Sequence, residues 1–314
     1  MGVKMNIISV NQFTVEMLES IFKRTDEMIA LSRESTGRKQ LASRHMEKQM
    51  CSIFYEPSTR TRTSFETAAL KLGMGVVSTE NAREFSSAAK GETLEDTFRV
   101  LNGYDFDVIV MRHHQTGAAA KAAAVSKTPL INAGDGKGEH PTQALLDAFT
   151  IRQRFGRLSN LNIVMGGDLA NGRTVRSLSQ LLSQFKGNRL SFVSQPQFQI
   201  GQDIKSRLKQ SNLDFQETDN VQSALKNADV VYWTRLQKER LDDKTKNVTG
   251  GFIINEDSLN YMKKDAIIMH PLPRVDEIAP AVDDDPRAYY FKQAGNGLYV
   301  RMALIDLLLS GQLA

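Results

Sequence analysis

The segment SIFYEPSTRTRTSFETAALKL, residues 52–72, runs from a short apolar stretch directly into a group of hydroxyl and guanidinium side chains. Its apolar part, Ser52–Tyr55, is typical of a buried strand, and the helical spacing of apolar residues over Thr63–Leu72 predicts a helix. A strand followed at once by a helix is the repeating unit of a parallel α/β sheet. This segment therefore predicts an α/β fold with polar side chains where the strand ends.

The same alternation continues along the chain and starts again near residue 160. We therefore expect two α/β domains, each a mainly parallel sheet flanked by helices, joined by interdomain helices. The expected boundaries are 1–150 for the first domain and 151–295 for the second, with 296–314 packing back across both. The expected strands are Ser52–Tyr55, Gly75–Ser78, Asp107–Met111, Thr128–Asn132, Leu161–Met165, Leu190–Val193, Asp229–Trp233 and Ala266–Met269. The expected helices are Thr14–Arg33, Thr63–Leu72, Glu92–Gly103, Thr174–Phe185 and about Gly297–Ser310.

Length and composition agree with a packed two-domain protein. The 314 residues exceed what one hydrophobic core usually holds, and 41% are hydrophobic and 24% charged, as in ordinary globular proteins. The net charge of +4 is small, and the basic residues are scattered, so we expect no nucleic-acid partner. Because no run approaches the ~20 apolar residues that span a bilayer, we also expect no membrane partner.

Cysteine usage points to a reducing compartment and away from structural zinc. Cys51 is the only cysteine, so the chain forms no internal disulfide, and no Cys/His cluster has zinc-site spacing. The first ten residues lack a basic segment followed by a long apolar run. We expect a cytoplasmic protein with no metal and no cofactor.

The hydroxyl-rich segment carries the most specific chemistry. If a helix begins there, its first backbone N–H groups, three hydroxyls and Arg60 could surround one phosphate group, because helix N-termini and guanidinium groups both bind anions. In the alternative interpretation, Ser58 or Thr59 only caps the helix and the arginines are solvated. The segment is neither a Walker loop nor a glycine-rich dinucleotide loop.

Histidines occur at two further positions where α/β sites gather. Met111-Arg112-His113-His114 ends a strand, and His140-Pro141-Thr142-Gln143 opens a helix after a glycine-rich stretch. A single histidine is more often a structural hydrogen-bonding residue than a catalyst, and the histidine pair has no companion metal ligands.

Three blocks in order carry a resemblance to a known family: Ser58-Thr59-Arg60-Thr61, His140-Pro141-Thr142-Gln143 and His270-Pro271-Leu272-Pro273-Arg274. Together with further blocks, they resemble the aspartate branch of the aspartate/ornithine carbamoyltransferase family along nearly the whole chain. The further blocks are Lys90-Gly91-Glu92-Thr93, Gly167-Asp168-Leu169, Gly172-Arg173-Thr174-Val175 and Thr234-Arg235-Leu236-Gln237-Lys238-Glu239-Arg240.

The resemblance implies that the carbamoyl group of carbamoyl phosphate is transferred to the amino group of L-aspartate in pyrimidine biosynthesis. The first domain would bind carbamoyl phosphate and the second the amino acid. Aspartate has two carboxylates, and the planar guanidinium groups of Arg173 and Arg235 are suited to bind them. Ornithine enzymes resemble the first half but carry a His-Cys-Leu-Pro motif where this chain has His270-Pro271-Leu272-Pro273. Transfer to another amino acid such as ornithine is the alternative.

The same resemblance assigns the site residues. The catalytic residues would be Arg60, Thr61, Lys90, Arg112 and His140. Carbamoyl phosphate would be bound by Ser58, Thr59, Arg60, Thr61, Ser86, Arg112, His140, Gln143, Pro271 and Leu272. Aspartate would be bound by Lys90, Arg173, Arg235 and Gln237.

The resemblance also implies an assembly. Ser86 and Lys90 would come from the neighbouring chain of a homotrimer with shared active sites, and separate regulatory chains could join it. The loop departs from bacterial relatives at Ser87-Ala88-Ala89, where a Gly and a second Lys are common, which puts its mobility and phosphate affinity in doubt.

Two other classes of protein remain to be distinguished. A dinucleotide-dependent dehydrogenase would need a G-x-G-x-x-G run, which Gly166-Gly167-Asp168 does not provide. It would also need an acidic residue directly after the next strand, and none is present there. A noncatalytic anion-binding protein could use the same arginines but would show no turnover.

Overall fold

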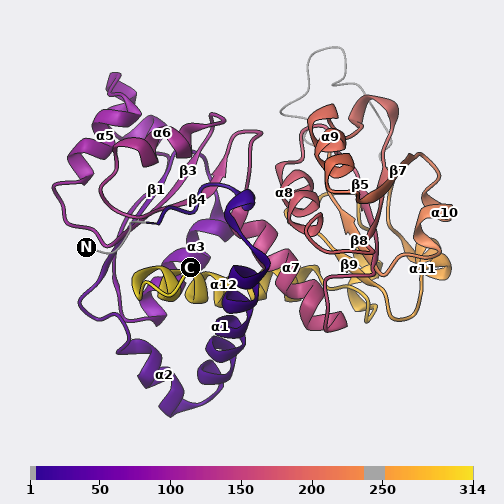
Figure 1. Ribbon diagram of the computed structural model, residues 1–314, viewed down its shortest axis with the longest axis horizontal. Helices are drawn as coiled ribbons and strands as arrows, with labels where there is room; N and C mark the ends of the chain where they lie inside the picture. The colour runs from indigo at the N-terminus through magenta and orange to yellow at the C-terminus, as the bar shows by residue number, and fades with distance from the viewer. Residues whose placement is uncertain (1–4, 237–251, 314) are drawn as a thin grey trace. The chain divides into compact units, whose positions relative to one another are not determined.

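The computed structural model describes residues 5–236 and 252–313. The chain divides into two compact units, one formed by residues up to Leu146 together with Gly295 onward and the other by Asp147–Ala294 (Figure 1). Two long helices, α7 (Pro141–Phe155) and α12 (Tyr290–Leu309), contain the two points at which the chain passes from one unit to the other.

The first unit contains a parallel sheet in the order β2-β1-β3-β4. Its strands are β1 (Gln49–Phe54), β2 (Gly75–Thr79), β3 (Val108–His113) and β4 (Leu130–Asp135). Its helices, besides parts of α7 and α12, are α1 (Val15–Arg33), α2 (Ser35–Ala42), α3 (Thr59–Lys71), α4 (Ala82–Phe85), α5 (Leu94–Leu101) and α6 (Ala118–Val125).

Alternate residues of the central strands bury the two faces of this sheet, as the period of two requires. Cys51 and Ile53 of β1 face the same way as Ile109 of β3 and pack with Phe98 of α5 and Ala122 of α6. Figure 1 shows α5 and α6 on one face of the sheet and α3 on the other. Cys51 is thus a buried strand residue, and burial raises the pKa of its thiol to about 11.

The end of α12 is fixed in the first unit by a buried carboxylate. Asp306 lies 2.8 Å from Nε of Arg44 and 2.8 Å from Nε2 of His45, and it also pairs with Arg24. Burial alone raises the pKa of Asp306, but its partners outweigh this and hold that pKa below its ordinary value. These contacts join α12 to α1 and to the segment before β1.

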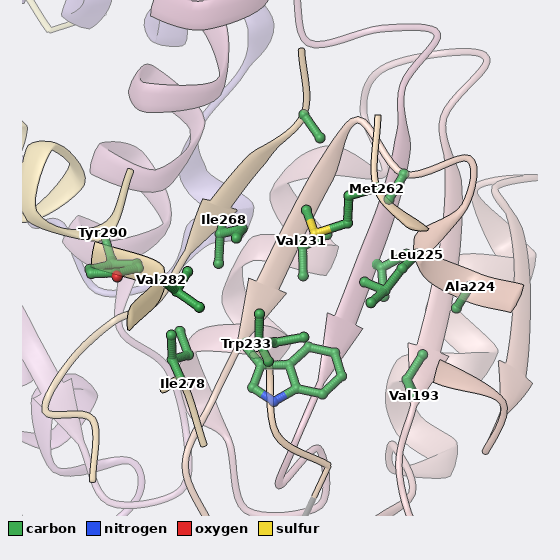
Figure 2. Close-up of a cluster of buried hydrophobic side chains, with 14 residues drawn as sticks. Val193, Ala224, Leu225, Val231, Trp233, Met262, Ile268, Ile278, Val282 and Tyr290 are labelled. Atoms are coloured by element: carbon green, nitrogen blue, oxygen red, sulfur yellow. The ribbon is translucent and has the colours of Figure 1, made fainter. Parts of the chain in front are cut away.

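The second unit repeats the architecture with a parallel sheet in the order β7-β6-β5-β8-β9. Its strands are β5 (Asn162–Gly166), β6 (Arg189–Val193), β7 (Asp214–Thr218), β8 (Val230–Trp233) and β9 (Ile267–Met269). Its helices are α8 (Arg173–Leu182), α9 (Gln202–Gln210), α10 (Val221–Leu225) and α11 (Glu256–Tyr261). Figure 2 shows Val231 and Trp233 of β8 with Leu225 of α10 in the core of one face.

The expected fold class is confirmed, with several differences in the elements. Helix α3 begins at Thr59, four residues before the expected Thr63, and α12 begins at Tyr290, seven before Gly297. The first turn of α3 contains only polar side chains, so apolar periodicity did not reveal it. Helix α12 instead begins with the aromatic residues Tyr290 and Phe291, which the expected helix did not include. Strand β7 was not expected because it is an edge strand with mostly exposed side chains. Among the described residues, no helix is long and apolar enough to cross a membrane.

Candidate active site

Helix α3 places the hydroxyl-rich segment directly at the carboxyl end of β1. Ser58 is the N-cap residue, but its side chain makes no capping hydrogen bond, so the alternative interpretation as a cap fails for Ser58. Thr61 is 8% exposed, whereas Thr59 and Arg60 are exposed. The first N–H groups of an α-helix have no partner within the helix, so this turn can bind an anion.

Arg62, in contrast, has a structural role. Its guanidinium lies 2.8 Å from Glu80 and 3.4 Å from Glu66, and it also donates to Ser78. These contacts tie α3 to the edge strand β2. The alternative interpretation had the arginines solvated. Arg62 is instead ion-paired within the fold.

Arg112 lies at the same edge of the sheet because β3 is the neighbour of β1. The backbone N–H of Tyr55 donates to the carbonyl of Arg112 over 2.9 Å. Nε of Arg112 lies 3.0 Å from the Glu56 carboxylate, and both side chains are largely buried, at 16% and 21% exposure. Sequence reasoning missed Glu56, although it lies within the most informative segment, because only the pairing of β1 with β3 reveals its partner.

His140 and Gln143 follow β4, the next strand in the sheet. Asp135, at the end of β4, organises the connection: its carboxylate accepts from the N–H groups of Gly117 (2.8 Å) and Glu139 (3.0 Å). His140 and Gln143 are both buried in or beside the first turn of α7. The ends of β1, β3 and β4 therefore present hydroxyl, guanidinium, imidazole and amide groups along one edge.

Ser86 and Lys90 do not join this group within the chain. Ser86 caps the short 3-10 helix Ser87–Lys90, where its hydroxyl accepts from the N–H of Ala88 over 3.2 Å and donates to the carbonyl of Ala82. Lys90 is exposed. Among the hydrogen bonds of the described residues, none joins either side chain to Ser58, Thr59 or Thr61.

The His113–His114 pair is built into the fold. Nδ1 of His113 accepts from the N–H of Gln115 over 3.0 Å, and its ring stacks on His114 with centroids 4.3 Å apart. Burial, followed by the charge of His114, lowers the pKa of His113 to about 4 from its ordinary value of 6.5. Over the part of the chain that the structure describes, no three His, Cys, Asp or Glu side chains gather as metal ligands.

This lowered pKa predicts a pH-dependent stability. Between pH 6.5 and 4 only the unfolded chain protonates His113. The contribution of this residue to the free energy of unfolding is therefore complete above pH 6.5 and is lost as the pH decreases. His113→Asn removes the titrating group and keeps an acceptor for the amide two residues on. Between pH 7 and pH 5 the wild type should lose about 2 kcal/mol more unfolding free energy than the variant. Urea unfolding at both pH values measures this, and equal losses would contradict it.

In the second unit, the ends of β5 and β8 approach so closely that only glycine fits. Gly167 has φ +102°, and a Cβ there would lie 1.9 Å from the carbonyl oxygen of Thr234. The N–H of Thr234 donates to the carbonyl of Gly166 over 2.9 Å. The loops that carry Arg173 and Arg235 therefore leave adjacent strands at the same edge of the sheet. Arg173 is buried at the start of α8, and Arg235 is half-buried.

The remaining predicted residues follow β9 or lie outside the described part. Pro271 and Leu272 are half-buried, and Leu272 has φ +55° and is followed by a cis peptide bond to Pro273. Gln237, expected to bind aspartate, is outside the described residues, as are Lys238, Glu239 and Arg240 of the same block.

The fold and these side chains define a two-domain α/β protein that collects cationic groups at the carboxyl edge of each parallel sheet. Family models match both halves: the carbamoyl phosphate-binding domain of aspartate/ornithine carbamoyltransferases over residues 5–153, and the Asp/Orn-binding domain over residues 159–308. The chain belongs to the aspartate/ornithine carbamoyltransferase family.

Individual relatives lie in its aspartate branch. The chain is 51% identical to a chloroplastic aspartate carbamoyltransferase of Arabidopsis thaliana, over 98% of this chain and 78% of the relative. It resembles the catalytic subunit of M. jannaschii aspartate transcarbamoylase, with a TM-score of 0.88, 42% identity and 98% coverage of both chains. It also resembles Trypanosoma cruzi aspartate transcarbamoylase in complex with carbamoyl aspartate and phosphate, with a TM-score of 0.86, 36% identity and coverage of 96% and 94%.

Proposed function

We propose that this protein transfers the carbamoyl group of carbamoyl phosphate to the amino group of L-aspartate, giving N-carbamoyl-L-aspartate and phosphate in pyrimidine biosynthesis. The observation that carries the proposal is the near full-length similarity to proteins named for this reaction, one of them solved with carbamoyl aspartate and phosphate. The cationic groups at both sheet edges suit substrates whose charges are phosphate and carboxylate.

The neutral amine of aspartate attacks the carbonyl carbon of carbamoyl phosphate. The new C–N bond forms as negative charge grows on the carbonyl oxygen; collapse then breaks the C–O bond to phosphate, and the amine proton leaves with the phosphate or to water. Fixed donors aimed at that oxygen stabilise the transition state, and this role falls to Thr61, Arg112 and His140. Glu56 holds the guanidinium of Arg112 in place.

The other residues hold and orient the substrates. The first turn of α3, with Ser58, Thr59 and Arg60, takes the phosphate, which lies where the helix N–H groups point. Gln143 and the carbonyls of Pro271 and Leu272 orient amino groups. Arg173 and Arg235, together with Gln237, bind the carboxylates of aspartate. Holding two substrates in line itself contributes strongly to the rate.

We further infer a homotrimer in which Ser86 and Lys90 act in the active site of a neighbouring copy. The exposure of Lys90 and the 76% exposure of Phe85 support this, because they leave the loop accessible to a second copy. A sedimentation mass of one chain, about 35 kDa, would reject the trimer. Separate regulatory chains could join this assembly. We also infer a cytoplasmic setting, because the chain has a single cysteine and forms no internal disulfide.

The experiment that tests the function compares aspartate and ornithine as acceptors, with carbamoyl phosphate as the donor and phosphate release as the measurement. Turnover should require aspartate. Turnover with ornithine alone would overturn the assignment of the second unit and leave that of the first. Binding of carbamoyl phosphate without turnover by either acceptor would identify a noncatalytic binding protein.

A further inference from the structure

The loop that follows β9 is closed on itself by a buried histidine–glutamate pair. Nε2 of His270 lies 2.7 Å from Oε1 of Glu277, and the two residues are 2% and 6% exposed. The other oxygen of Glu277 accepts from the backbone N–H groups of Val275 (3.1 Å) and Asp276 (3.2 Å). Both carboxylate oxygens are therefore used within the loop 270–277.

The opposite nitrogen of His270 holds Leu272. The N–H of Leu272 donates to Nδ1 of His270 over 2.7 Å. A ring nitrogen that accepts carries no proton, so this network assigns the neutral tautomer in which Nε2–H donates to Glu277. The ring thus transmits the fixed position of Glu277 to the backbone of Leu272.

Leu272 needs such support because its backbone is in the left-handed region. With φ +55° it has a conformation in which the Cβ of a residue other than glycine crowds the backbone. Residues held this way persist only where their surroundings determine the conformation, and they concentrate at functional sites. The hydrogen bond to His270 is the side-chain contact that fixes this amide.

The backbone of His270 is anchored as well. Its N–H donates to Oε1 of Gln293 over 2.8 Å, and Nε2 of Gln293 donates to Asp147 over 2.6 Å. The other Asp147 oxygen accepts from the hydroxyl of Tyr232 over 2.9 Å. All of these residues belong to the second unit, so its loop is tied to β8, α7 and the start of α12.

We propose that His270 and Glu277 are positioning residues that set the direction of the Pro271 carbonyl. The inference rests on the proposed function, which gives this carbonyl the task of orienting a substrate amino group. Neither side chain has to touch substrate: Glu277 fixes the ring, the ring fixes the amide of Leu272, and that peptide plane aims the carbonyl of Pro271. A misdirected acceptor weakens alignment of the reacting groups, to which rates are sensitive.

The test uses variants that remove or rebuild the contact with Leu272. His270→Ala removes the acceptor and should lower kcat/KM on the order of tenfold. His270→Asn should recover most of this loss, because an Asn side chain accepts from the amide two residues on. Glu277→Gln keeps an oxygen for Nε2–H and should behave similarly to His270→Asn. Leu225→Ala, in the core of the same unit, controls for lost stability without touching the loop.

A structural role alone predicts a different pattern. In that case His270→Ala and Leu225→Ala would lose thermal stability and keep the wild-type kcat and KM of the folded fraction, which would overturn the proposal. An Asn variant no better than the Ala variant would overturn it too.

A second readout separates this proposal from the proposed function. In protein labelled with ¹⁵N-histidine, His270 should show an unprotonated, hydrogen-bonded Nδ1 and a protonated Nε2 at neutral pH, identified by its loss in His270→Ala. A protonated Nδ1 would overturn the positioning contact. Absence of turnover by the wild type would instead reject the function, whatever these signals show.

Discussion

Replacing Arg112 by alanine is expected to lower kcat roughly 10²–10³-fold, the loss that follows removal of one donor to a growing oxyanion. The guanidinium lies at the end of β3, and the Glu56 carboxylate 3.0 Å away restricts its motion before substrate binds. The effect should appear mainly in kcat, because the donor interacts most strongly with the charge that exists only in the transition state. Steady-state kinetics with both substrates measures it.

The matched control for this substitution is Arg99→Ala in the same unit. Arg99 forms an ion pair with Asp96 on the surface of α5, with side chains 63% and 54% exposed, so its loss should leave kcat unchanged. Glu56→Gln should give an intermediate loss, because it keeps Arg112 but weakens its positioning. If Arg112→Ala retains kcat and changes only stability, the residue is a structural partner of Glu56 and the carbonyl assignment is wrong.

Replacing Arg235 by alanine is expected to raise KM for aspartate roughly 10²-fold while changing KM for carbamoyl phosphate little. A hydrogen-bonded ion pair with a carboxylate contributes about 1.5–3 kcal/mol, and each 1.4 kcal/mol is a factor of ten in affinity. The approach of Thr234 to Gly167 fixes where Arg235 leaves the sheet.

Arg189→Ala is the control for this second substitution. Arg189 pairs with Asp214 on the exposed edge of the same sheet, with both side chains 63% exposed, so its removal should change neither KM. An unchanged KM for aspartate in Arg235→Ala would assign the acceptor carboxylates to other side chains. Equal rises in both Michaelis constants would indicate general distortion of the second unit.

The comparison of sequence with structure differs between the fold and the site. The strand and helix patterns around residues 52–72 predicted the parallel α/β class, because buried parallel strands are nearly continuous apolar runs. Helix starts were less well placed, since the first turn of α3 contains only polar residues and is defined by backbone geometry. The edge strand β7 has no apolar run to reveal it.

Ion pairs and loop contacts were not visible in the sequence. Glu56 and Arg112 are 56 positions apart and meet because β1 and β3 are neighbours, although β2 lies between them in the chain. His270 and Glu277 are only seven positions apart, yet nothing in the motif indicates that one supports the other. Gln293 and Asp147 come from helices at distant points of the chain.

The sequence by itself determined the fold class, the family and the residue types available for binding phosphate and carboxylates. These properties depend on local patterns and on short motifs in a fixed order. The tertiary structure alone decided which charges are paired, which side chains face the carboxyl edges of the sheets, and which groups hold Leu272 in its left-handed conformation. Strand order and side-chain packing create those contacts between distant residues, and the free energy of each contact depends on the burial that folding imposes.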